Sequence, residues 1–232
     1  MSISVCIATY NGEKYIKAQL ESILMQLGEE DEVVISDDAS TDNTIAIIRS
    51  IEDPRIRLFT GHRFGSHVYN FEHALKQAKG EYLFLSDQDD IWLPNKVSHT
   101  IPLLQTYDLV LSDAVMVDAH GAQIHDSFFR FNHSRKGILK NFYKNSYLGC
   151  CMAFRRSVLL KALPFPPDIN MHDWWIGMIA EIHFNVHFSD EKLILYRRHQ
   201  DAVTPLDRRS TNPLLTKIGF RINLLKGLIA RW

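Results

Sequence analysis

The chain has 232 residues, of which 46% are hydrophobic, so it can bury the core of one large α/β domain. Its net charge of −1 and pI near 6.8 supply no field that would gather a polyanion, which disfavours a nucleic-acid binder. Three cysteines do not make a secreted disulfide framework, and no stretch reaches the roughly 18 apolar residues of a membrane-spanning helix, so we expect a protein of the reducing cytoplasm.

Strands and helices are predicted to alternate through the first half of the chain. Apolar, β-branched runs indicate the strands, and apolar residues at helical spacing indicate the helices. The predicted strands cover residues 3–8, 32–36, 55–60 and 82–86, and the predicted helices cover residues 16–27, 45–51 and 67–79. Gly80 is expected to end the third helix as a left-handed cap. This alternation predicts a three-layer α/β/α sandwich with a mostly parallel sheet, whose ligands bind beyond the carboxyl ends of the strands.

The second half is less regular. Residues 118–145 have the weak periodicity that is typical of loops and a short helix covering a binding face. Around them we predict helices over residues 96–105 and 172–182 and strands over residues 109–112, 149–154, 186–188 and 193–197. We therefore expect one domain over residues 1–205, made of halves 1–112 and 113–205, of which the second receives a partner molecule. A tail over residues 206–232 follows.

An acidic cluster directly follows the strand predicted at residues 82–86. Asp87, Asp89 and Asp90 have apolar residues on both sides, which argues against a solvated acidic turn, the alternative interpretation. Two carboxylates about 6 Å apart repel by roughly 3 kcal/mol at an effective dielectric of 20, so the cluster needs a cation. We expect Asp89 to bind Mg²⁺ or Mn²⁺ directly and Asp87 to act through water or on a ribose hydroxyl, while Asp90 caps the next helix.

Three motifs carry a resemblance to a known family. Ala8-Thr9-Tyr10-Asn11, the segment from Ser36 to Asp42, and Asp87-Gln88-Asp89-Asp90 each follow a predicted strand. In this order they resemble family 2 glycosyltransferases, inverting enzymes of the GT-A fold that use nucleotide-diphosphate sugars. The resemblance implies that the nucleotide is bound by Thr9, Tyr10, Asn11, Asp38, Asp87 and Gln88. Asp38 would accept a hydrogen bond from the pyrimidine ring N–H; taken alone, it is equally well read as a turn residue.

The segment Met171-His172-Asp173-Trp174-Trp175 is similar to the catalytic-base motif of that family. The resemblance implies that Asp173 deprotonates the acceptor hydroxyl, and that Trp174 and Trp175 dry the carboxylate and stack on sugar C–H faces. Asp173 could instead only cap the following helix, whose dipole would keep it ionised. Gly149 resembles the glycine that lets donor or acceptor sugar approach the backbone, and the alternative is an internal strand with a bulge glycine.

Two arginines and a histidine follow the last predicted strand. The resemblance implies that Arg197 and Arg198 bind the pyrophosphate and that His199 is a further metal ligand. A surface ion pair with Asp190 or Glu191 is the alternative reading of the two arginines.

The tail carries a basic amphipathic pattern from residue 214 onward. Its apolar positions share one helical face and are Leu214, Ile218, Ile222, Leu225, Ile229 and Trp232. Flanking lysines and arginines favour binding of residues 214–232 to the inner face of the cytoplasmic membrane. Docking on the core of the chain or on a second subunit, as in a homo-oligomer, is the alternative.

Within the family, the acidic cluster and His172-Asp173-Trp174-Trp175 look most like bacterial rhamnosyltransferases. We therefore expect transfer of L-rhamnose from dTDP-L-rhamnose to a saccharide or lipid-linked saccharide in cell-surface polysaccharide synthesis. A UDP-hexose or UDP-N-acetylhexosamine donor is the first alternative, because no residue visibly reads the base. A non-catalytic nucleotide or saccharide binding module is the second, disfavoured because every charged position that the chemistry requires is filled.

Overall fold

The computed structural model describes residues 2–199 and 213–231, which build a central nine-stranded sheet. The strands run in the order β3-β2-β1-β4-β8-β6-β9-β5, and β7 pairs with β6. They are β1 (Ile3–Thr9), β2 (Glu32–Asp37), β3 (Ile56–Phe59), β4 (Tyr82–Ser86), β5 (Ile91–Trp92), β6 (Leu109–Val117), β7 (Gln123–His125), β8 (Met152–Arg155) and β9 (Val186–Arg197). The first four are parallel to their neighbours in this part of the sheet, as predicted.

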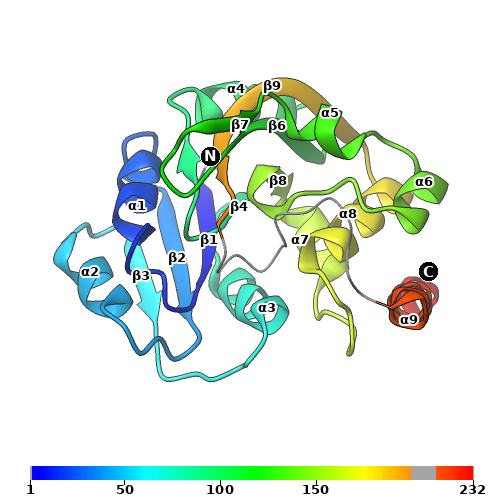
Figure 1. Ribbon diagram of the computed structural model, residues 1–232, viewed down its shortest axis with the longest axis horizontal. Coiled ribbons are helices and arrows are strands. Elements are labelled where there is room, and N and C mark those ends of the chain that lie inside the picture. The colour runs from blue at the N-terminus through cyan, green and yellow to red at the C-terminus, as the bar shows by residue number, and fades with distance from the viewer. Residues whose placement is uncertain (1, 200–212, 232) are drawn as a thin grey trace.

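Helices pack on this sheet and on one another. They are α1 (Ile16–Leu24), α2 (Thr44–Ser50), α3 (His67–Gln77), α4 (Lys96–Leu104), α5 (Phe128–Asn132), α6 (Ile138–Tyr143), α7 (Arg156–Ala162), α8 (His172–His183) and α9 (Leu214–Arg231), with a 3-10 turn at Gly149–Cys151. Figure 1 shows α1 and α2 side by side, with the first strands between them and α3. The three-layer α/β/α prediction is confirmed.

The strand order places a crevice at the ends of β1 and β4. The chain moves outward from β1 to β2 and β3, and then returns to the other side of β1 for β4. The loops after β1 and β4 therefore leave the sheet in opposite directions, which opens the ligand-binding position of a doubly wound sheet. Thr9 ends β1 and Ser86 ends β4, so the polar segments that follow them line this crevice.

Several local predictions needed correction. Gly80 is not a left-handed cap, because α3 ends in the extended backbone of Ala78. A Cβ at Gly80 would lie 2.6 Å from the backbone nitrogen of Ser4, so close packing against β1 explains this glycine. The two strands predicted over residues 186–188 and 193–197 are one strand, β9, because both parts pair with β6 across irregular register. The tail forms helix α9; its residues 206–212 and 232 lie outside the described part of the chain.

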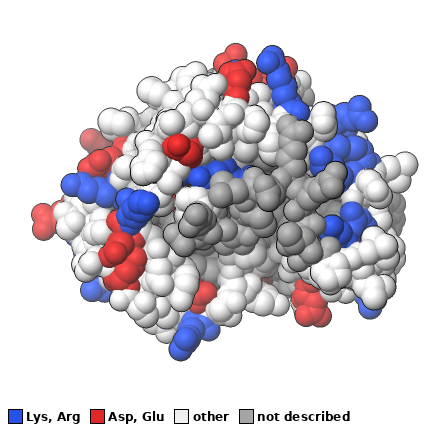
Figure 2. Space-filling view, in the orientation of Figure 1, with Lys and Arg blue, Asp and Glu red and all other residues white. Residues whose placement is uncertain are grey.

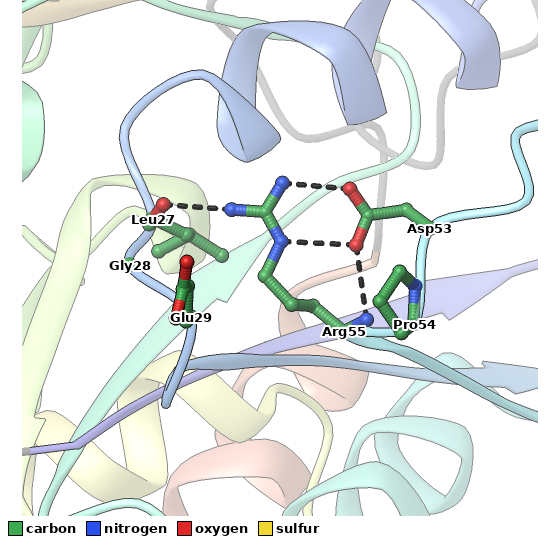
Figure 3. A pocket seen from close by; sticks show the side chains of 6 residues that line it. All are labelled: Leu27, Gly28, Glu29, Asp53, Pro54 and Arg55. Carbon is green, nitrogen blue, oxygen red and sulfur yellow. Dashed lines mark hydrogen bonds and ion pairs between the residues drawn. The ribbon is translucent and has the colours of Figure 1, made fainter.

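A hollow at the opposite end of the strands is closed by an arginine (Figure 3). Arg55 precedes β3, and its Nε and Nη2 donate to the two oxygens of Asp53 at 2.9 and 2.6 Å. Its Nη1 donates to the carbonyl of Leu27 at 2.7 Å, which ties the end of α1 to the start of β3. This bidentate pairing satisfies the polar groups internally, so the hollow has a structural role.

Candidate active site

The two aspartates after β2 have different partners. Asp37 is fully buried, and its Oδ2 accepts a 2.9 Å hydrogen bond from Oγ1 of Thr9, which is also fully buried. Asp38 is 8% exposed, and its Oδ1 accepts from the backbone N–H groups of Phe64 and Gly65. Its Oδ2 has no hydrogen bond among the described residues. Thr9 thus joins β1 to β2, whereas Asp38 keeps one oriented carboxylate oxygen for a ligand.

Gln88 and Asn11 connect the loops around the crevice. The side-chain amide of Gln88 accepts from the backbone N–H of Tyr10 and donates to its carbonyl, both at 3.0 Å. A Cβ at Gly12 would overlap Oε1 of Gln88, so a larger residue there would displace this amide. Asn11 has a left-handed backbone with φ 49°, and its Oδ1 accepts from the N–H of Thr41 at 2.8 Å. Both polar side chains therefore position loops, and the Tyr10 side chain remains exposed.

Asp90 belongs to the acidic site rather than to a helix cap. It is fully buried, its Oδ1 accepts from the backbone N–H of Arg197 at 2.9 Å, and its Oδ2 has no partner among the described residues. The expected capping role is wrong, because α4 begins only at Lys96. Single ligand-type atoms of Asp87, Asp90 and Cys150 lie within 4.8 Å of one another.

This concentration of carboxylates shifts their protonation. Burial raises the pKa of Asp87 to about 7, and the charges of Asp89 and Asp173 add to that effect. Burial, followed by the charge of Asp89, raises the pKa of Asp90 well above its usual range. Asp173 is therefore near enough to Asp87 for the two carboxylates to repel each other. The loop after β4 and the start of α8 converge on one acidic site.

Lys96 is a buried cation beside this site that the sequence did not point to. It is 1% exposed, its Nζ donates to the carbonyl of Cys150 at 3.2 Å and lies 5.0 Å from the ring centroid of Trp92. Burial lowers its pKa, and the charge of Asp90 opposes that shift. One lysine offsets only part of the charge of three carboxylates, so the cluster retains room for a further cation.

Asp89 and His199 are brought together from positions 110 residues apart. Oδ2 of Asp89 and Nε2 of His199 lie 2.7 Å from each other. An octahedral ion with ligands at about 2.1 Å places neighbouring ligand atoms about 3 Å apart, which is near this separation. The carboxylate suits Mg²⁺ or Mn²⁺, and the imidazole favours a transition-metal ion such as Mn²⁺ over Mg²⁺. Burial raises the pKa of the neighbouring Cys150 thiol, which disfavours thiolate ligation. The donor set therefore fits a divalent cation.

Arg197 ends β9 and Arg198 follows it, and the two differ in how many of their hydrogen-bond donors are already paired. Arg197 donates from Nε to the carbonyl of Asp89 at 2.8 Å, and its guanidinium stacks 4.8 Å from the ring centroid of Tyr15. Arg198 is 5% exposed, and its Nε has no partner among the described residues. Arg197 thus shapes the loop that carries Asp89, while Arg198 is a buried guanidinium with a donor to spare.

Asp173 lies at the start of α8 in a buried position, 5% exposed. Its Oδ1 accepts from the N–H of Trp174 at 2.6 Å, and hydrogen bonds from Gly149 and Asn145 add to this. Burial nevertheless raises the pKa of Asp173 to about 7, so desolvation outweighs these hydrogen bonds. A carboxylate of this basicity can accept a proton from a hydroxyl near neutral pH.

The neighbouring tryptophans belong to the core. Trp175 is fully buried, and its Nε1 donates to the carbonyl of Ala162 at 2.9 Å, which leaves no ring face for a sugar. Trp174 is 7% exposed, and its Nε1 donates to the carbonyl of Asn141 at 2.7 Å. This corrects the expected sugar stacking: both rings are buried and hydrogen-bonded in the core, where they fix α8. Gly149 packs on the same turn, because a Cβ there would lie 3.0 Å from Nε2 of His172.

Comparison with known proteins shows which family the chain belongs to. The model of the family "Glycosyl transferase family 2" matches residues 4–163. The dTDP-rhamnosyl transferase RfbG of Shigella flexneri is 29% identical over 219 residues, covering 84% of this chain and 72% of that protein. The Escherichia coli UDP-Glc:alpha-D-GlcNAc-diphosphoundecaprenol beta-1,3-glucosyltransferase WfaP is 37% identical over 110 residues, covering 47% of this chain and 44% of its own length.

Solved structures share the fold. The S. aureus TarS fragment 1-349 in complex with UDP-GlcNAc has a TM-score of 0.75 at 22% identity and covers 98% of this chain and 67% of that one. The mannosyltransferase PcManGT from Pyrobaculum calidifontis, in complex with GDP-Man and Mn²⁺, has a TM-score of 0.62 at 19% identity and covers 99% and 62%. Both are longer than the segment that this chain matches.

Proposed function

Because the chain belongs to glycosyl transferase family 2, we propose that it moves a sugar from a nucleoside diphosphate to a saccharide hydroxyl with inversion. One observation carries the proposal: the acidic loop after β4 and the buried carboxylate of Asp173 converge, so that the charge of Asp173 adds to burial and to the charge of Asp89 in raising the pKa of Asp87. A general base and a diphosphate-binding centre in one crevice are what inverting transfer requires.

In this function Asp173 takes the proton of the acceptor hydroxyl, and its raised pKa suits that role at neutral pH. Asp38 accepts the ring N–H of the nucleobase through its second oxygen. Arg198 offers its spare donor to the diphosphate, and Arg197 holds the loop of Asp89. A divalent ion held by Asp89 and His199 would neutralise charge on the departing diphosphate.

The donor we propose is dTDP-L-rhamnose, supported by the 29% identity to the Shigella rhamnosyl transferase. UDP-hexose and UDP-N-acetylhexosamine donors are the alternative, supported by the E. coli glucosyltransferase. A panel of dTDP-rhamnose, UDP-glucose, UDP-galactose and UDP-GlcNAc with Mn²⁺ separates them by release of the nucleoside diphosphate. If none of these donors is hydrolysed although the protein still binds the nucleotide, a non-catalytic binding module becomes the better interpretation.

Transfer should depend on pH through Asp173. Its folded pKa of about 7 means that the carboxylate is protonated below neutrality, whereas an ordinary aspartate is ionised from about pH 5 upward. We expect kcat/KM at saturating Mn²⁺ to rise about tenfold per pH unit up to about pH 7 and then to level off. A flat profile between pH 5.5 and 8 would contradict the assignment of the base.

The acceptor we propose is a lipid-linked saccharide of bacterial cell-surface polysaccharide synthesis, reached from the cytoplasmic face of the membrane. Within the described residues, no helix has the length and apolar character needed to cross a bilayer. Helix α9 instead packs through Leu224 and Leu228 and exposes Ile218 and Ile222 between basic residues. Flotation with phosphatidylglycerol vesicles tests this: Ile218→Glu with Ile222→Glu should abolish it, and retention would refute membrane binding.

A further inference from the structure

A pocket with basic walls lies between α5 and α6, in the second half of the chain. Its cavity of about 450 Å³ is lined by His133, Ser134, Arg135 and Lys140. Residues 127–167 contain no aspartate or glutamate, and Figure 2 shows lysines and arginines gathered on the side of the molecule that carries α6. In the part of the chain that the structure describes, neither Arg135 nor Lys140 forms an ion pair with a carboxylate.

The cation at the back of the pocket is held in place but not neutralised. Lys140 is half-buried, and its Nζ donates to Oγ of Ser146 and Oδ1 of Asn141. Burial lowers the pKa of Lys140 to about 8, and the charges of Lys144 and Arg135 lower it further, against the attraction of Glu181. An anion would relieve this repulsion among like charges.

Glu181, the nearby carboxylate, has other partners. Its Oε1 accepts from the backbone N–H of Gly137 at 2.9 Å and from Nδ2 of Asn141 at 3.0 Å. It therefore fixes the start of α6 and does not occupy the pocket. Arg135 and His133 are exposed, so an incoming anion can reach them without a rearrangement of the core.

The pocket shares a loop with the candidate base. Oγ of Ser146 accepts from the backbone N–H of Arg135 at 3.1 Å, and the carbonyl of Ser146 accepts from Oγ of Ser134 at 3.0 Å. The preceding residue, Asn145, hydrogen-bonds to Asp173 through its side chain. One peptide unit thus joins the wall of the pocket to the carboxylate that would receive the acceptor proton.

We propose that this pocket binds the phosphate groups that join the acceptor sugar to its lipid, with Arg135 and Lys140 as their ligands. The inference rests on the proposed function and assigns its acceptor class as a lipid diphosphate saccharide. Arg135 can pair two phosphate oxygens at once, and Lys140 adds a point charge behind them. Leu139 and Tyr143 flank Lys140 on α6, and their exposed side chains could contact the first carbons of the lipid.

Calorimetry with hexyl diphosphate, and with hexanol as the uncharged probe, tests the site without a nucleotide sugar. We expect the full chain to bind hexyl diphosphate and not hexanol. Arg135→Gln with Lys140→Gln should weaken binding at least about tenfold, since charge-assisted hydrogen bonds are lost. The matched control, Lys17→Gln with Lys76→Gln, removes the same charge from α1 and α3 and should bind as the wild type does.

Three results would overturn the inference. Equal weakening in the control pair would mean general electrostatic attraction. Loss of binding in Arg198→Gln, with binding retained in the pocket variant, would place the probe in the donor crevice. If the pocket variant no longer floats with phosphatidylglycerol vesicles but binds hexyl diphosphate as the wild type does, the cations belong to a site for membrane headgroups. Because hexyl diphosphate needs no donor, a failed nucleotide-sugar panel would refute the proposed function and leave this binding result standing.

Discussion

Replacing Asp173 by asparagine should lower kcat for sugar transfer by about a thousandfold. Asparagine keeps the shape of the side chain and can still accept from the N–H of Trp174, but it cannot take a proton. Nucleotide binding should be unchanged, because Asp173 lies on α8 and the expected nucleotide ligands follow β1, β2 and β4. Steady-state transfer assays and calorimetry with the nucleoside diphosphate measure the two quantities.

Asp168→Asn is the matched control for that variant. Asp168 is an exposed aspartate with φ 63°, a conformation that asparagine also adopts, so activity should be retained.

The Asp173→Asn protein should also be at least as stable as the wild type at pH 8. The raised pKa means that the folded state keeps a proton that the unfolded chain releases near pH 4, so the wild type loses stability as the pH rises from about 4 to about 7, and the full loss is present at pH 8. Activity within tenfold of the wild type would remove Asp173 as the base.

Chelation of divalent metal, or replacement of Asp89 by alanine, should lower transfer by at least about a hundredfold. Oδ2 of Asp89 and Nε2 of His199 lie 2.7 Å apart, and the charge of Asp89 also acts on the carboxylates of Asp87 and Asp90. Burial raises the pKa of both neighbours and the charge of Asp89 adds to this, and an ion bound there would offset the repulsion. Mn²⁺ should therefore raise the Tm of the wild type, and this increase should be smaller in Asp89→Ala.

Asp190→Ala provides the comparison for the metal experiment. Asp190 is an exposed acid on β9, the strand that leads to His199, and its loss should change neither the Mn²⁺ effect on Tm nor transfer. Restoration of chelated enzyme by Mn²⁺ separates metal loss from damage by the chelator. Full turnover after exhaustive chelation would show that Lys96 and the arginines suffice as counter-charges.

Much of the architecture follows from residue patterns along the chain. Buried strands with continuous apolar runs are recognisable at residues 3–8, 32–36 and 82–86, and each is followed by a polar segment. Parallel strands bring those segments to one edge, so the sequence alone predicts a crevice that contains Asp38 and Asp89. The antiparallel strands are harder to predict from the sequence. Ile91–Trp92, for example, is too short to show a periodic pattern, yet it pairs with β9.

The sequence determined the residue types of the site, because strand periodicity and strand order are local patterns with a regular spatial consequence. The tertiary structure decided their environment. Asp90 became a buried carboxylate, Trp175 became core, Lys96 became a cation under the acidic loop, and Asp173 acquired its raised pKa. Burial and electrostatic shifts depend on which distant segments pack against a side chain, and α8, which carries Asp173, packs against α3 and α6, which lie apart from it in the chain.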